Sequence, residues 1–148
     1  MDRVILLIHV GGSSLKANLA AVQAEKHGLI LDRDITFDID AGGQLSSIVG
    51  TFEKLVQYLL LMGLGAASGG FSVEGLALAV PGPCDYARGI PQMKGLGKYQ
   101  ALYDIPFFPH MDRIVRDGAR RVSERTGQKV EVPPELKMIM QNDARMYA

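Results

Sequence analysis

Asn142 and Asp143 are the residue pair with the clearest capacity for chemistry in this sequence. They follow an apolar run, 136–141, which predicts a buried strand. A carboxylate at a strand end can accept a proton from a hydroxyl group, and a neighbouring amide can both donate and accept hydrogen bonds. The same pair would also cap a helix beginning at Ala144, because Asn and Asp are favoured N-cap residues. The pair is a candidate for acid–base chemistry or for helix capping.

A second candidate site is the turn Gly11-Gly12-Ser13-Ser14, which separates two predicted strands, 4–10 and 15–22. Glycine has no side chain to keep a ligand away, so this turn can present backbone N–H groups and hydroxyls to a phosphate. It is not a Walker loop, which requires Gly-Lys-Ser or Gly-Lys-Thr at the start of a helix. An ordinary hairpin turn with no ligand is the alternative.

The third candidate is Pro81-Gly82-Pro83, directly after the predicted strand 76–80. Proline forces the backbone out of the sheet and leaves Gly82 where a ligand could approach the main chain. A rigid turn without a binding role fits equally well, and Asp85 is expected to cap that turn. The irregular segment 81–109 is rich in Gly and Pro, and long excursions of this kind often carry binding residues.

The elements that must position these motifs follow from hydrophobic periodicity. Three strands, 4–10, 15–22 and 29–39, predict an antiparallel meander, and helical spacing over 45–60 predicts an amphipathic helix. A loop over 63–70, a strand over 76–80, a second helix with apolar positions across 111–122 and a last strand over 136–140 complete the order. This order predicts an α/β fold, a mixed sheet covered by helices. Ligands of such sheets bind beyond the carboxyl ends of strands, where all three motifs lie.

Composition narrows the class of protein. The 148 residues suffice for one lobe with a substantial core, and 16 basic residues balance 16 acidic ones. No overall field would attract nucleic acid or an anionic membrane, and the arginines of the second helix are interrupted by acidic residues, which indicates a solvated face. The single cysteine, Cys84, excludes an internal disulfide and a cysteine zinc cluster. The apolar start is too short to span a membrane, no export signal is visible, and we expect a cytoplasmic protein.

With these motifs in this order, the chain resembles the amino-terminal lobe of ROK-family sugar kinases, in the larger group of actin, Hsp70 and hexokinase. Four segments carry the resemblance. They are 8–16, in the place of a strand and Asp-x-Gly-Gly-Thr; 80–89, with Pro-Gly-Pro, an acidic residue and a glycine; 94–99, in the place of Pro-Asn-Leu-x-Gly-Trp; and 138–144, a strand with Asn-Asp-Ala. The resemblance implies a ribonuclease H-like, actin-like ATPase lobe over residues 1–148, with the carboxy-terminal lobe absent from this sequence.

The resemblance also implies an activity, the ATP-dependent phosphorylation of a hexose by a glucokinase-like enzyme. Asp143 would accept the proton of the sugar hydroxyl that attacks the γ-phosphate, with ATP and Mg²⁺ as cofactors. The implied sugar contacts are Asn142, Gly82, Lys94 and Gly95, and the implied phosphate contacts are Gly11, Gly12, Ser13 and Lys16. The lobe alone is expected to be inactive, and no metal ligand is assigned within it.

Two departures from the family pattern support a different function. His9 stands where the family has an aspartate that organises the metal, and a neutral imidazole suits Mg²⁺ poorly. Gly95 stands where an asparagine would contact the sugar, which leaves Lys94, Gln92 or Lys98 as substitutes. The alternative is therefore a non-catalytic sugar-binding or regulatory protein on the same fold, and a third possibility is a domain for protein contact alone.

Partners follow from the same comparison. A lobe without its second half exposes apolar surface, so we expect a dimer or another homo-oligomer unless a second lobe covers that surface. Regulators of this family carry a DNA-binding helix-turn-helix before the first strand, whereas here the first strand starts within a few residues of Met1. We expect no nucleic-acid partner and no membrane partner.

Overall fold

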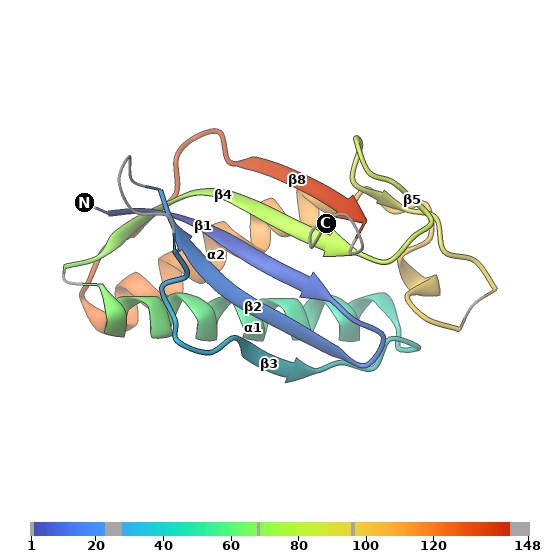
Figure 1. The fold of residues 1–148 in the computed structure, drawn as a ribbon, viewed down its shortest axis with the longest axis horizontal. Helices are drawn as coiled ribbons and strands as arrows, with labels where there is room; N and C mark the ends of the chain where they lie inside the picture. Colours follow the sequence, from blue (N-terminus) through green and yellow to red (C-terminus); the bar gives the residue numbers. More distant parts are fainter. Residues whose placement is uncertain (1, 23–27, 68, 96, 143–148) are drawn as a thin grey trace.

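A computed structural model describes residues 2–22, 28–67, 69–95 and 97–142 of the chain. One mixed sheet forms its centre (Figure 1). In chain order the elements are β1 (Asp2–Val10), β2 (Ser14–Ala21), β3 (Ile35–Asp38), α1 (Leu45–Ala66), β4 (Phe71–Val80), β5 (Cys84–Asp85), β6 (Ile90–Pro91), the 3₁₀ turn η1 (Gln100–Leu102), α2 (Phe107–Thr126), β7 (Val130–Glu131) and β8 (Lys137–Asn142).

The sheet has the strand order β3-β2-β1-β4-β7, and β8 also pairs with β4. β1 pairs antiparallel with β2, and β2 pairs antiparallel with β3. β4 lies parallel to β1, and both β7 and β8 lie parallel to β4. The predicted mixed sheet with three initial antiparallel strands is confirmed. Because β1, β4 and β8 run in one direction, their carboxyl ends meet at one edge of the sheet (Figure 1).

Both helices pack on the same face of this sheet and enclose the core (Figure 1). Alternate residues of β1 are buried against them, from Val4 to Val10, as the two-residue period of a strand requires. An edge-to-face contact between Phe52 and Phe107, with ring centroids 5.2 Å apart, joins α1 to α2. By length and composition alone α1 could cross a membrane. Its apolar stripe is buried in this core instead, as in a core helix of a globular domain.

Several element boundaries differ from the predictions. The third strand covers only 35–38 of the expected 29–39, with an isolated bridge at Leu29. α1 continues to Ala66, into the expected loop 63–70, because Leu64 extends the apolar stripe and the small Gly63 fits against the Phe71 ring. β4 begins five residues earlier than predicted, at Phe71.

Two further differences concern the second half of the chain. α2 begins at residue 107, so the irregular segment ends earlier than predicted, and inside it β5 and β6 pair as a short hairpin. The short strand β7 was not predicted, because two residues carry no readable period.

The exposed face of α2 confirms the prediction of a solvated, charge-balanced surface. Three of its arginines form ion pairs with acidic residues, most of them three or four positions away on the helix: Arg113 with Asp117 and Glu53, Arg116 with Asp112, and Arg120 with Asp117 and Glu124. Arg116 also donates to the carbonyl of Pro134 at 2.9 Å, which links α2 to the segment that leads into β8. The positive charge of these arginines is therefore largely balanced locally.

Candidate functional site

The carboxyl edge of the sheet brings together three of the motifs singled out in the sequence (Figure 1). The turn 11–14 follows β1, the segment 81–83 follows β4, and Asn142 is the last residue of β8. The parallel pairing of β1 with β4, and of β4 with β8, causes this convergence. It is the arrangement in which ligands bind to open α/β sheets.

Gly82 and Asn142 lie next to each other, with Tyr86 between them. A β-carbon built on Gly82 would lie 3.3 Å from Nδ2 of Asn142 and 2.9 Å from the Tyr86 hydroxyl oxygen. Nδ2 of Asn142 donates to that hydroxyl oxygen at 3.0 Å, and the hydroxyl donates to the carbonyl of Val80 at 3.2 Å. Glycine at position 82 therefore lets the Tyr86 hydroxyl and the Asn142 amide pack directly against the backbone. Tyr86 was not predicted as a site residue; its only signal was a place just after Pro-Gly-Pro.

Asp143, the predicted base, lies outside the described residues, as does Ala144, where the capped helix would begin. Both interpretations of the Asn-Asp pair therefore stay predictions. Asp85 was expected to cap the turn 81–83, but it caps the following turn of the chain instead. Its carboxylate accepts a hydrogen bond from the N–H of Arg88 at 3.3 Å and forms an ion pair with the Arg88 guanidinium at 3.5 Å, which closes the turn between β5 and β6.

The turn 11–14 is a tight hydrogen-bonded structure. The N–H of Gly11 donates to the carbonyl of Ser14 at 2.8 Å, and the N–H of Ile39 donates to the carbonyl of Ser13 at 3.1 Å. A β-carbon on Gly11 would lie 2.8 Å from the Ser14 carbonyl oxygen, so only glycine fits there. Within the described chain the N–H groups of Gly12 and Ser13 have no acceptor, and both residues are exposed. These two N–H groups, rather than that of Gly11, can bind an anion.

Tyr99 is hydrogen-bonded to the turn 11–14 through its buried side chain. Its side chain is fully buried and its hydroxyl donates to the carbonyl of Gly11, while its own N–H donates to the carbonyl of Ala41 at 2.6 Å. Burial raises the pKa of Tyr99 to about 12, so the hydroxyl stays protonated and keeps donating to a higher pH than that of an exposed tyrosine. Tyr99 thus ties the β1–β2 turn to the β3–α1 turn. The resemblance placed an aromatic residue here, but nothing in the sequence indicated the partner of its hydroxyl.

The loop before Tyr99 carries three of the predicted sugar-contacting or substitute residues. Lys94 places its ammonium 5.6 Å from the centroid of the Tyr103 ring, and Gly95 is exposed with a positive φ of 76°. Lys98 points elsewhere: a β-carbon on Gly12 would lie 2.5 Å from Nζ of Lys98. The Lys98 ammonium therefore lies against the β1–β2 turn. Contact of Lys94 or Gly95 with a sugar stays a prediction.

His9 and Lys16 face each other across β1 and β2, on the sheet face opposite the helices. They line a pocket of about 310 Å³ together with Asn18 and Asp34, whose side chains are hydrogen-bonded to each other at 2.9 Å. Lys16 lies two residues after the turn 11–14, so its ammonium is a second positive charge, besides that of Lys98, at this edge of the sheet.

The donor set around the turn does not suit Mg²⁺. Magnesium requires oxygen ligands in an octahedron, usually with one or two carboxylates. The side chains that flank the turn are an imidazole, from His9, and two ammonium groups, from Lys16 and Lys98. The one carboxylate that lines the pocket of His9 and Lys16 is that of Asp34, and it accepts a hydrogen bond from Asn18. In the described ranges no three His, Cys, Asp or Glu side chains are grouped to hold a metal. The described residues therefore do not fit the expected magnesium ion.

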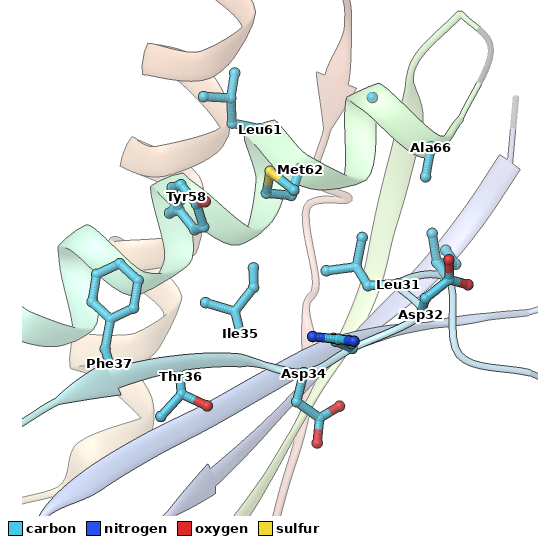
Figure 2. Close-up of a pocket in the computed structure, with 13 residues that line it drawn as sticks. Leu31, Asp32, Asp34, Ile35, Thr36, Phe37, Tyr58, Leu61, Met62 and Ala66 are labelled. Carbon is cyan, nitrogen blue, oxygen red and sulfur yellow. The ribbon is translucent and has the colours of Figure 1, made fainter.

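A larger groove, of about 870 Å³, lies elsewhere, between the segment 30–37 and the second half of α1 (Figure 2). Apolar side chains of both elements face it, among them Phe37, Tyr58 and Met62. None of the predicted site residues lines this groove. The carboxyl edge of the sheet remains the candidate site.

Solved structures share this fold. A putative sugar kinase from Cytophaga hutchinsonii matches over 95% of this chain and 36% of its own length, with a TM-score of 0.53 and 16% identity. A ROK-family transcriptional regulator, a homologue of the E. coli MLC protein, matches over 88% of this chain and 27% of its own, with a TM-score of 0.54 and 15% identity. The ROK hexokinase of Thermus thermophilus matches over 88% and 34%, with a TM-score of 0.45 and 15% identity.

The chain therefore spans about a third of the length of these structures. No family model and no curated protein matches the sequence. At TM-scores of 0.53 and 0.54 and identities of 16% and 15%, the likeness to the Cytophaga protein and the regulator shows the fold alone, and the activity is to be argued from the site. The chain has the mixed α/β fold that the sequence predicted, and it shares this fold with these solved structures.

Proposed function

We propose that this chain is the amino-terminal lobe of a protein that phosphorylates a hexose with ATP. One observation carries the proposal: the exposed N–H groups of Gly12 and Ser13 and the Asn142 amide beside Gly82 share one edge of the sheet. A phosphate group and a sugar hydroxyl bound at this edge would be held close to each other, and positioning is a large part of catalysis in phosphoryl transfer.

Each residue has a distinct role in this proposal. Asp143 takes the proton of the attacking hydroxyl, and Asn142 binds a neighbouring hydroxyl through its amide. Tyr86 fixes the orientation of that amide through the 3.0 Å hydrogen bond. Gly82 leaves room for this amide beside the backbone, Gly12 and Ser13 bind the transferred phosphate, and Lys16 contributes positive charge. A second lobe supplies the rest of the nucleotide site.

The test is a phosphotransfer assay on the full-length natural protein, with ATP and a panel of hexoses. The unaltered protein is expected to phosphorylate at least one hexose. Asp143→Asn is expected to lower kcat by about 10²-fold or more, because it removes the proton acceptor. Lys129→Gln, in the exposed turn after α2, is the control and is expected to keep full activity. Absence of both hexose turnover and hexose binding would refute the proposal, as would full activity of Asp143→Asn.

A non-catalytic sugar-binding or regulatory protein is the second candidate, and His9 is the observation that favours it. The imidazole lies at the phosphate turn where a carboxylate would help to hold Mg²⁺. In this case hexose binds, no phosphoryl group is transferred, and Asn142→Ala weakens hexose binding. Phosphotransfer that appears in His9→Asp but not in the unaltered protein would identify loss of the metal ligand as the reason for the missing activity.

A further inference from the structure

Lys98 lies against the turn 11–14, a contact that neither the sequence nor the proposed function assigns. Nζ of Lys98 occupies the space that a side chain at position 12 would fill, since a β-carbon there would lie 2.5 Å from it. The ammonium is therefore packed directly against the backbone of Gly12. The exposed N–H groups of Gly12 and Ser13 belong to the same turn.

The Lys98 ammonium is not neutralised by a carboxylate. It makes no ion pair within the described residues, in contrast to three arginines of α2. The carboxylate of Asp40, in the β3–α1 turn, makes no ion pair with Lys98 and accepts the N–H of Gly42 at 3.1 Å. An unpaired ammonium beside two N–H groups without acceptors is a set of donors that suits an anion with several oxygens.

Neighbouring contacts restrict where Lys98 can go. The next residue, Tyr99, is fixed by its hydrogen bonds to Gly11 and Ala41, so the backbone is held directly after Lys98. Gly97, the preceding residue, has a positive φ of 69°, which directs the chain over the β3–α1 turn. The ammonium thus starts close to the position in which it would contact a ligand of the turn.

We propose that Lys98 and the N–H groups of Gly12 and Ser13 form a phosphoanion site, in which the Lys98 ammonium directly contacts the bound phosphate. The inference deepens the proposed function, on which it rests for the identity of that phosphate as the transferred group of ATP. Lysine binds phosphate as a compact charge and needs no metal to do so. It compensates for His9, which replaces the carboxylate that would bring Mg²⁺ to the turn.

The probe is inorganic pyrophosphate, titrated without metal into the ¹⁵N-labelled chain and followed by the amide NMR signals of Gly12 and Ser13. These signals are expected to shift and saturate in the unaltered chain. Lys98→Gln is expected to weaken binding about tenfold, as loss of one charged hydrogen bond implies, whereas Lys98→Arg restores it. Lys129→Gln, an equal change of charge in an exposed turn after α2, is expected to bind as the unaltered chain does.

Gly12→Ala provides an independent test that leaves every charge in place. Its methyl group takes the space of Nζ, and the far end of a lysine side chain can move away without unfolding the domain. Pyrophosphate binding is expected to weaken about as much as in Lys98→Gln. Equal affinity of Lys98→Gln and the unaltered chain would overturn the inference, and so would the absence of any shift in the unaltered chain.

A hexose titration of the same samples, read at Asn142 and Gly82, separates this inference from the proposed function. Hexose binding that is equal in Lys98→Gln and the unaltered chain, together with weakened pyrophosphate binding, supports both. Weakened pyrophosphate binding without any hexose binding retains the Lys98 site and contradicts the sugar kinase. If hexose binds and Lys98→Gln leaves the pyrophosphate affinity unchanged, the role of Lys98 is contradicted and the proposed function is retained.

Discussion

The substitution Tyr99→Phe tests whether the tie between the two turns stabilises the domain. The change removes one hydroxyl from a fully buried side chain and leaves the ring in place, so no large cavity forms. The lost partner is the carbonyl of Gly11. A buried acceptor left without a donor costs about 1–3 kcal/mol. Because Gly11 is partly exposed, water can reach its carbonyl, and we expect the lower half of that range, about 1–2 kcal/mol.

The expected change is large enough to measure. Unfolding entropies of roughly 2.1 cal/mol/K per residue over the chain imply a fall in Tm of about 3 °C per kcal/mol, or about 3–6 °C in total. Calorimetry gives the Tm, and urea unfolding should show a lower midpoint with an unchanged m-value. Tyr58→Phe is the control, because its ring is 44% exposed and a surface change of this kind should stay within about 0.5 kcal/mol.

The pH dependence of stability provides a second test, of the burial of the Tyr99 hydroxyl. The pKa of Tyr99 is raised from 10.0 to about 12 in the folded chain, because burial disfavours the charged phenolate. The resulting stability is fully present below pH 10 and is lost as the pH rises from 10 towards 12. The difference in stability between the unaltered chain and Tyr99→Phe should therefore shrink over that interval. Equal stability of the two proteins at neutral pH would refute the role of the tie.

Four further substitutions test backbone strain, helix packing and self-association. Gly70→Ala should destabilise by about 2 kcal/mol or more in urea unfolding, because φ is +96° and the new carbon would lie 2.3 Å from the carbonyl oxygen of Lys129; Gly69→Ala, with φ +91° and open space, isolates the backbone strain and should cost about 1 kcal/mol. Gly118→Leu should lower the Tm by overpacking the α1–α2 contact, where a β-carbon already meets α1 at 3.3 Å, at a cost of about 1–3 kcal/mol; an unchanged Tm would contradict that close approach. Ile139, 51% exposed on the sheet face opposite the helices, should promote self-association, so Ile139→Lys should lower the mass measured by light scattering; a monomeric unaltered chain at all concentrations would contradict the expected oligomer.

Local patterns were sufficient to predict most elements of this fold. The apolar runs of β1, β2 and β8 and the helical stripes of α1 and α2 are short-range periodicities, which can be recognised in the sequence without knowledge of tertiary contacts. Boundaries were less predictable, because tertiary contacts decide where an element ends. β4 begins at Phe71, where its pairing with β1 and β7 starts, although its own sequence shows a clear apolar run only from residue 76.

The candidate site divides in the same way. The sequence alone determined the chemistry available: a glycine turn able to present N–H groups, a Pro-Gly-Pro after a strand, and an amide beside a carboxylate at a strand end. Only the tertiary structure decided that Gly82 lies against Asn142, that Tyr99 holds a carbonyl 88 residues away, and that Lys98 covers Gly12. These contacts join distant segments through the sheet and its loops, so no local spacing encodes them. The parallel pairing of β1, β4 and β8 brings the strand ends together at one edge of the sheet. The loop fixed there by Tyr99 then places the Lys98 ammonium against the turn 11–14.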